Sequence, residues 1–100
     1  MVLSLADRFP RTPPAIHVAA QLVKSATSPV ANYAEARAAE SRKDFIHKLR
    51  ICLKELRETH VWLRLVERMN FCPAQRVAAS DECSELIAII VSSINTARRS

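Results

Sequence analysis

The amino-acid sequence predicts an all-α bundle of four helical segments, of which the first is short. Glycine is missing from all 100 residues, although tight hairpins and phosphate-binding loops usually require it. Alanine, leucine, arginine and glutamate are abundant instead, and these residues are good helix formers. In the longest segment, apolar residues recur at alternating intervals of four and three, which is the spacing of one helix face. These features argue against an all-β fold, a P-loop and a dinucleotide-binding loop.

Prolines and polar caps set the bounds of the first two segments. A short segment over Val2–Phe9 ends at a run of prolines. Thr12 followed by Pro13 is typical of a helix start, so we expect a second helix over Pro14–Glu40. Pro29 lies in its middle and should kink or interrupt it, because proline donates no backbone hydrogen bond. The expected apolar side of this helix consists of Ile16, Ala19, Ala20, Val23 and Ala26.

The third helix carries the clearest pattern in the chain. Ser41 and Asp44 resemble a capping box at the start of a helix that we expect over Ser41–Met69. Its apolar seam steps by four and three residues, with one threonine as its only polar member, and consists of Phe45, Leu49, Cys52, Leu56, Thr59, Leu63 and Val66. This heptad spacing is typical of helical bundles and coiled coils.

A turn should connect the third helix to the fourth. We place it at Asn70–Pro73, because Pro73 disfavours helix at the preceding Cys72. The fourth helix is expected over Ala74–Arg98. Its C-terminal half is strongly apolar, which predicts burial on more than one side, and contains Leu86, Ile87, Ile89, Ile90, Val91 and Ile94.

A row of basic residues, here called the basic stripe, lies opposite the apolar seam of the third helix. At 100° per residue, its members fall within roughly 100° of arc: Lys43, His47, Arg50, Lys54, Arg57, Arg64 and Arg68. The chain has 15 Lys and Arg against 10 Asp and Glu, a net charge of +5. Such a row can follow the phosphates of a nucleic acid. The alternative is a solvated face, on which Lys and Arg serve solubility and helix formation.

The remaining polar residues point to structure more than to catalysis. Glu55 and Glu58 could take part in acid–base or metal chemistry with a histidine, but ordinary ion pairs explain them as well. Trp62 on the same flank fits a packing or interface anchor. The histidines lack metal-ligand spacing, and hydrolase, kinase and redox motifs are missing. We therefore assign no catalytic residue, metal ligand or cofactor.

A length of 100 residues predicts a single domain over residues 1–100, and three features indicate a cytoplasmic location. The three cysteines form no CxxC pair and no even-numbered disulfide framework, which fits a reducing compartment. The N-terminal stretch has no basic region followed by a long apolar run, as a signal peptide would have. The longest apolar run, Leu86–Val91, has six residues, so we expect no membrane span.

Two stretches resemble a known bacterial family. Residues 28–35, SPVANYAE, are similar to the SIPANIAEG motif of the 23S rRNA intervening-sequence proteins. Residues 41–59, SRKDFIHKLRICLKELRET, open the third helix. They resemble the family segment S-x-K-[DE]-F-I-x-x-L-R-I-A-x-x-S-L-x-E-T. Residues 81–90 are similar to the start of its last helix. The resemblance covers roughly residues 15–97.

This resemblance implies an antiparallel up-and-down four-helix bundle that assembles as a homopentamer. Genes of the family can lie inside intervening sequences of 23S rRNA genes. A related branch comprises the accessory proteins of diversity-generating retroelements, which bind nucleic acid and associate with a reverse transcriptase. The polar positions that match the family are expected to make structural contacts between helices: Asn32, Glu35, Glu55 and Glu58.

The chain departs from the family in two places. Ala36 replaces the usual glycine, so we expect the second helix to continue there. Family members also begin with a long first helix, of which Val2–Phe9 matches only the last two turns. The expected fold is therefore a bundle with a shortened first helix, whose gap either stays open or is covered by a neighbouring chain.

Two functional hypotheses stay open at this point. The first is a non-enzymatic oligomer that binds RNA or DNA phosphates through the basic stripe. The second is a protein-interaction or scaffold module without nucleic-acid affinity, with Trp62 and the apolar fourth helix in subunit contacts. A small metal-dependent enzyme is a third and weaker interpretation.

Overall fold

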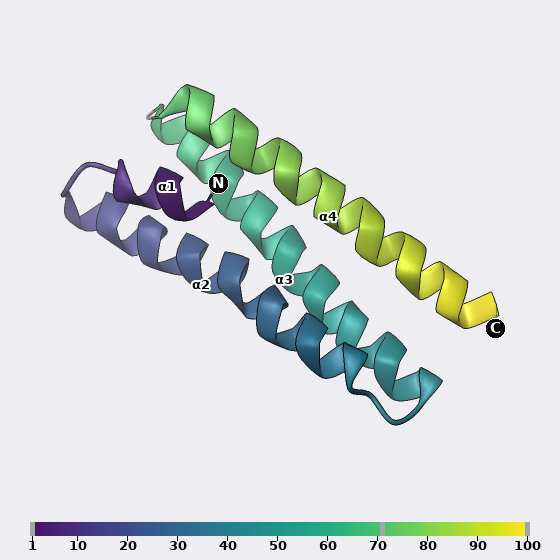
Figure 1. Cartoon of the computed structure of the whole chain (residues 1–100). Helices are drawn as coiled ribbons and strands as arrows, with labels where there is room; N and C mark the ends of the chain where they lie inside the picture. Colours follow the sequence, from purple (N-terminus) through teal and green to yellow (C-terminus); the bar gives the residue numbers. More distant parts are fainter. Residues whose placement is uncertain (1, 71, 100) are drawn as a thin grey trace.

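A computed structural model describes residues 2–70 and 72–99, and these form four α-helices without a strand (Figure 1). The helices are α1 (Val2–Asp7), α2 (Pro13–Arg37), α3 (Arg42–Met69) and α4 (Pro73–Arg99). The prediction of an all-α four-helix bundle with a shortened first helix is confirmed. The predicted helix bounds are correct to within three residues.

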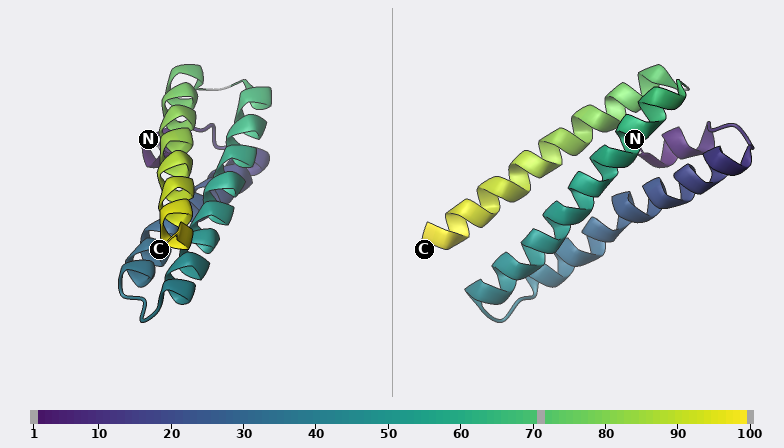
Figure 2. Two further views of the ribbon diagram at one scale, coloured as in Figure 1. Left: turned by 90° about the vertical axis from the view of Figure 1, so that its right-hand side faces the viewer. Right: turned by 180° about the vertical axis from the view of Figure 1, so that it is seen from behind.

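The three long helices run antiparallel to their neighbours, with α3 between α2 and α4 (Figures 1 and 2). α3 packs against both of them, whereas no Cα atom of α2 lies within 8 Å of one in α4. α1 contacts α2 and α4 from the other side and lies across the space that separates them. The molecule is elongated, measuring 47 × 19 × 16 Å, because helices of 25 to 28 residues lie side by side along its length.

Polar caps start α2 and α3 as the sequence predicts. The Thr12 side chain accepts a hydrogen bond of 3.4 Å from the Ala15 N–H, and Ser41 accepts one of 3.0 Å from the Asp44 N–H. Each bond satisfies a backbone donor that the first helical turn leaves unpaired. The predicted end of α2 at Glu40 is wrong, because the helix ends at Arg37. Residues 38–40 instead connect the end of α2 to Ser41, whose backbone is extended.

Pro29 neither interrupts nor ends α2, which continues for eight residues beyond it. Two hydroxyls in the preceding turn donate to helix carbonyls: Thr27 Oγ1 to Val23 at 2.8 Å and Ser28 Oγ to Lys24 at 2.8 Å. The Pro29 carbonyl accepts a bond of 3.6 Å from Cys52 Sγ of α3. The Cys52 contact links α2 to α3 at the proline, whereas hydroxyl bonds of the Thr27 and Ser28 type are typical of places where a helix bends.

The buried side of α2 differs from the predicted one. The structure buries another line of residues, Ala15, Val18, Leu22, Ser25, Pro29 and Ala36. Ile16, placed on the apolar side by the sequence, is 51% exposed, and Ala20 is also exposed. The alanine-rich sequence offers little contrast between the faces of this helix, so packing against α3 decides which face is buried.

The apolar seam of α3 is the confirmed centre of the core. Six of its seven members are buried, and Phe45 is half-buried against the same cluster. The polar member, Thr59, lies with its hydroxyl 3.0 Å from Ser25 Oγ of α2 and 2.9 Å from the Glu55 carbonyl. The hydroxyl is therefore satisfied inside the core, where an unpaired one would be costly.

The turn into α4 uses left-handed backbone. Asn70, the C-cap of α3, has a φ of 55°, and Cys72 has a φ of 52°. This confirms that Cys72 does not adopt helical backbone before Pro73. Phe71, inside the predicted turn, lies outside the described residues.

The predicted burial of α4 on more than one side is wrong. Ile90 and Ile94 are buried, but Leu86 is 42% and Ile89 is 58% exposed. Both line a groove that α4 forms with α2 and α3. Leu86 also borders a pocket with Val2 and Leu3 of α1, whereas Ile89 lies beyond the short first helix and stays uncovered.

In residues 2–70 and 72–99, no helix combines the length and apolar character that a membrane crossing requires.

The buried thiol of Cys83 predicts a loss of stability at high pH. Burial, followed by the charge of Glu82, raises the pKa of this thiol from 9.0 to about 11. Above pH 9 the unfolded chain releases this proton first, so the free energy of unfolding falls as the pH rises toward 11. Urea unfolding followed by circular dichroism should show this decline.

The variant Cys83→Ala should show a shallower decline over the same pH range. Some decline should persist, because burial also raises the pKa of the Cys52 thiol. A variant whose stability falls as steeply with pH as that of the wild-type protein would contradict this assignment.

Candidate functional site

The basic stripe lies on the side of α3 opposite its buried seam. Seen from behind, α3 runs in front of the space that α1 enters (Figure 2, right). All seven side chains assigned to the stripe from the sequence are exposed: Lys43, His47, Arg50, Lys54, Arg57, Arg64 and Arg68. They are exposed because the opposite side of the helix is committed to the core through the apolar seam. The face also carries the apolar Val61, which is 59% exposed, between Arg57 and Arg64.

No carboxylate among residues 2–70 and 72–99 forms an ion pair with a cation of the stripe. Among the described residues, the ion pairs join Lys48 to Glu35 at 3.0 Å and Arg76 to Glu67 at 3.7 Å. Neither pair includes a residue of the stripe. Lys48 belongs to the contact between α2 and α3. The hydrogen bond to Glu35 and the charge of Glu35 raise the pKa of this lysine. The charges of the stripe are therefore available to an external partner.

The structure adds a cation from α4 to one end of the stripe. Arg98 lines a shallow cleft together with residues at the start of α3, namely Arg42, Lys43, Ile46, His47 and Arg50. The antiparallel packing of α3 and α4 brings the end of one beside the beginning of the other. The spacing of residues along α3 does not reveal Arg98. In an antiparallel pair of helices, however, the end of α4 is expected beside the start of α3.

A second cleft lies midway along the stripe, again between α3 and α4. It is lined by Arg57, His60, Val61, Arg64, Ser84 and Ile87, and we call it the His60 cleft. His60 Nε2 lies 3.3 Å from the Ser80 carbonyl oxygen and 3.2 Å from Ser84 Oγ. The sequence did not reveal this cleft, because spacing along α3 does not show which residues of α4 face His60.

The polar residues that match the family motif differ in what they contact. Asn32 Nδ2 donates to Glu55 Oε1, which links α2 to α3, and Glu35 makes the ion pair with Lys48. These three residues and Lys48 therefore make the inter-helix contacts that a structural role requires. Glu58 is exposed, and neither ion pair of the described residues includes it.

The possible metal or catalytic groups are dispersed. Glu55 is engaged by Asn32, and His17 contacts the Trp62 ring in a T-shaped arrangement, with 6.3 Å between ring centroids. Trp62 therefore acts as a packing residue between α2 and α3. Within the part of the chain that is described, no three His, Cys, Asp or Glu side chains lie close enough to hold a metal ion.

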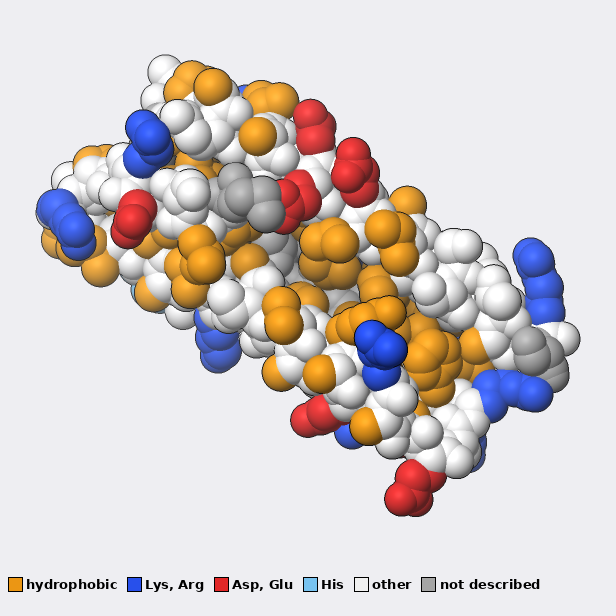
Figure 3. All heavy atoms as spheres, in the orientation of Figure 1, with side chains coloured by type: hydrophobic (Ala, Val, Ile, Leu, Met, Phe, Trp, Pro, Cys, Tyr) orange, Lys and Arg blue, Asp and Glu red, His pale blue; other side chains and the backbone are white. Residues whose placement is uncertain are grey.

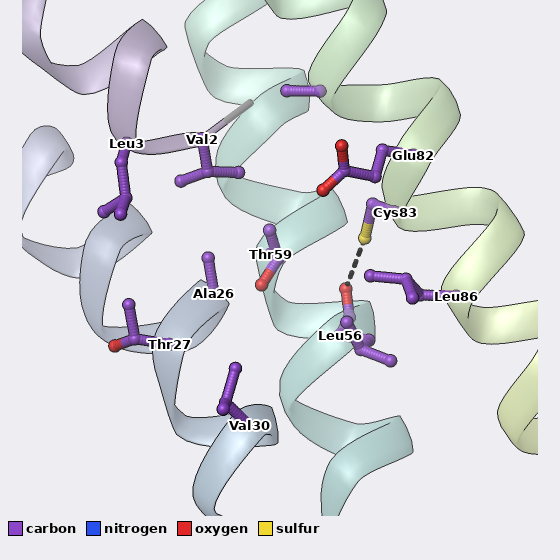
Figure 4. A pocket seen from close by; sticks show the side chains of 11 residues that line it. Val2, Leu3, Ala26, Thr27, Val30, Leu56, Thr59, Glu82, Cys83 and Leu86 are labelled. Carbon is purple, nitrogen blue, oxygen red and sulfur yellow. Dashed lines mark hydrogen bonds between the residues drawn. The ribbon is translucent and has the colours of Figure 1, made fainter.

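A groove runs between α2 and α4, on the opposite face from the stripe. α1 covers its first half, where Val2 and Leu3 border a pocket together with Leu56 of α3 and Leu86 of α4 (Figure 4). Beyond the tip of α1, hydrophobic side chains gather on the surface (Figure 3). We call this open half the apolar groove, which is lined by Ala26, Pro29, Val30, Tyr33, Cys52, Leu56, Leu86, Ile89 and Ile90.

The chain is similar to one described family over almost its whole length. The family described as 23S rRNA-intervening sequence protein matches residues 1–92. Among curated proteins, none matches the chain.

A solved structure shares both the fold and much of the sequence. It is the crystal structure of a protein of unknown function from the S23 ribosomal protein family of Bacteroides thetaiotaomicron. The two chains are 38% identical and superpose with a TM-score of 0.74, over 77% of this chain and 72% of the other.

Proposed function

Because the chain belongs to the 23S rRNA-intervening sequence protein family, we propose that it is a non-enzymatic helical-bundle protein that binds RNA or DNA phosphates through the basic stripe. The observation that carries this proposal is the row of exposed basic side chains on α3. Among the described residues, none of them forms an ion pair with a carboxylate. A surface of this kind binds a polyanion largely by releasing the condensed counterions of the nucleic acid.

The geometry of α3 suits a linear polyanion better than a small anion. One helical turn rises by about 5.4 Å, so successive cations of the stripe follow one another at a spacing of roughly one turn. No Phe, Tyr or Trp lies among the seven residues of the stripe, so base stacking contributes little. The proposed binding is therefore directed at the backbone and depends weakly on base sequence.

Reversing three adjacent charges should abolish most of the binding. The variant Arg50→Glu, Lys54→Glu, Arg57→Glu replaces three cations at the centre of the stripe with carboxylates, which repel phosphates. We expect the affinity for a structured RNA to fall at least a hundredfold at low salt. Electrophoretic mobility shift with purified protein measures this change.

A matched control separates the stripe from net charge. The variant Arg8→Glu, Arg11→Glu, Lys24→Glu makes the same change in net charge at exposed positions outside the stripe. It should retain affinity within a few-fold of the wild-type protein, because the reversed charges lie away from the bound phosphates. Equal losses in both variants would mean that net charge, and not the stripe, determines binding.

The apolar groove favours a second candidate function, a scaffold or protein-interaction role with self-association. Val30 is 73% exposed and Ile89 is 58% exposed, and they lie on opposite walls of the groove. Exposed apolar surface costs about 25 cal/mol per Å² relative to burial. A second copy of the chain that covered the groove would remove this cost, which supports a homo-oligomer such as the family pentamer.

Charged residues in the groove should dissociate such an oligomer. We expect the double variant Val30→Glu, Ile89→Glu to be monomeric in light scattering at a concentration at which the wild-type protein is oligomeric, because burying unpaired carboxylates is unfavourable. The control Ile16→Glu, Val77→Glu changes the same residue types on α2 and α4 at exposed positions outside the groove.

This control should retain the wild-type mass. A wild-type protein that is monomeric at every concentration tested would rule out self-association through the groove. The same light-scattering measurement with RNA at two salt concentrations separates the two functions, because only the nucleic-acid proposal predicts a complex that dissociates at high salt.

A further inference from the structure

The His60 cleft lies where the stripe has its widest gap between cations on α3. Arg57 and Arg64 are two turns apart, and the exposed Val61 lies between them. At this point α4 contributes Ser84 to the surface, and the cleft between the two helices has a volume of about 430 Å³. The gap between the two arginines is therefore occupied by a cleft that α3 and α4 form together.

The hydrogen bonds of His60 determine which way the Ser84 hydroxyl can donate. The Ser80 carbonyl, 3.3 Å from Nε2, can only accept. The carbonyl therefore favours the tautomer with the hydrogen on Nε2, in which Ser84 Oγ, 3.2 Å away, accepts from His60. In this tautomer no hydrogen bond given for the described residues uses the hydrogen of the Ser84 hydroxyl, which can then donate to a ligand in the cleft.

The donors around the cleft match a phosphate group. The guanidinium groups of Arg57 and Arg64 supply positive charge on either side, and neither belongs to an ion pair of the described residues. A phosphodiester has only acceptor oxygens, and hydrogen bonds from arginine and hydroxyl groups to such oxygens are strengthened by the negative charge. The acidic Asp81 and Glu85 of α4 are exposed but do not line the cleft.

We propose that the His60 cleft binds one phosphate group of a nucleic-acid backbone, with Arg57 and Arg64 neutralising its charge and the Ser84 hydroxyl donating to a non-bridging oxygen. This inference rests on the proposed function and makes it more specific. Most of the stripe supplies charges on flexible side chains, whereas Ser84 supplies a directed donor that fixes the position of the backbone along α3. The nucleic acid is accordingly in contact with α4 as well as α3.

The test compares Ser84→Ala with Ser93→Ala in the full chain, using a fluorescently labelled RNA hairpin and anisotropy at several salt concentrations. Ser93 is also on α4, but its hydroxyl donates to the Ile89 carbonyl at 2.9 Å, outside the cleft. Ser84→Ala should weaken binding roughly tenfold, as loss of a hydrogen bond to a charged group does. Ser93→Ala should match the wild-type protein.

Two further readouts distinguish the cleft from a general effect on folding or charge. Ser84→Thr retains the hydroxyl and should restore most of the affinity. Ser84→Ala should leave the slope of log affinity against log salt unchanged because it removes no charge, whereas Arg57→Ala should reduce the steepness of the slope by about one. Circular dichroism checks that each variant remains helical.

The outcomes separate this inference from the proposed function. If the wild-type protein binds RNA and the triple charge reversal abolishes binding, but Ser84→Ala binds as tightly as the wild type, the cleft proposal is overturned and the stripe remains. If the wild-type protein does not bind RNA at low salt, both are overturned.

Discussion

The apolar seam of α3 is the contact on which the rest of the structure depends. α3 is the helix that packs against both α2 and α4, and its buried residues hold these helices together although α2 and α4 do not approach each other. The largest fully buried side chains of the described residues include Leu49, Cys52, Thr59 and Val66 of this seam. Core residues of this kind contribute stability through area removed from water and through close packing.

The same constraint determines what the other side of α3 can do. A helix whose seam is buried on one side must direct the residues opposite to it into solvent, and here most of these are basic. The structural acid–amide and ion-pair contacts lie on the flank facing α2, where Asn32 meets Glu55 and Lys48 meets Glu35. The flank facing α4 contains the clefts at Arg98 and His60. One flank thus adds polar contacts between α3 and α2, and the other forms a cationic surface with α4.

The sequence was most informative where polar and apolar residues alternate sharply. The bounds and the seam of α3 follow from its heptad pattern, and the caps at Thr12 and Ser41 follow from local hydrogen-bond chemistry. The buried face of α2 could not be found in this way, because alanines occur on all its sides and Ile16 proves exposed. The burial of α4 was overestimated, because Leu86 and Ile89 face a groove that the short α1 does not fill.

The candidate site was only partly predictable for a related reason. The seven residues of the stripe share one helix, so their spacing alone places them on one face. Ser84 is 24 residues from His60, and Arg98 is 56 residues from Arg42. Whether such residues meet depends on the crossing and register of α3 and α4, which no local pattern encodes.

The most direct test of the account is the salt dependence of RNA binding by the wild-type protein. Each phosphate that a Lys or Arg neutralises contributes about −0.7 to −0.9 to the slope of log affinity against log salt. The stripe has six Lys and Arg side chains, so a nucleic acid bound along its whole length predicts a slope of roughly −4 to −5. A slope near zero, or no binding even at low salt, would contradict the view that the outer face of α3 is a nucleic-acid surface.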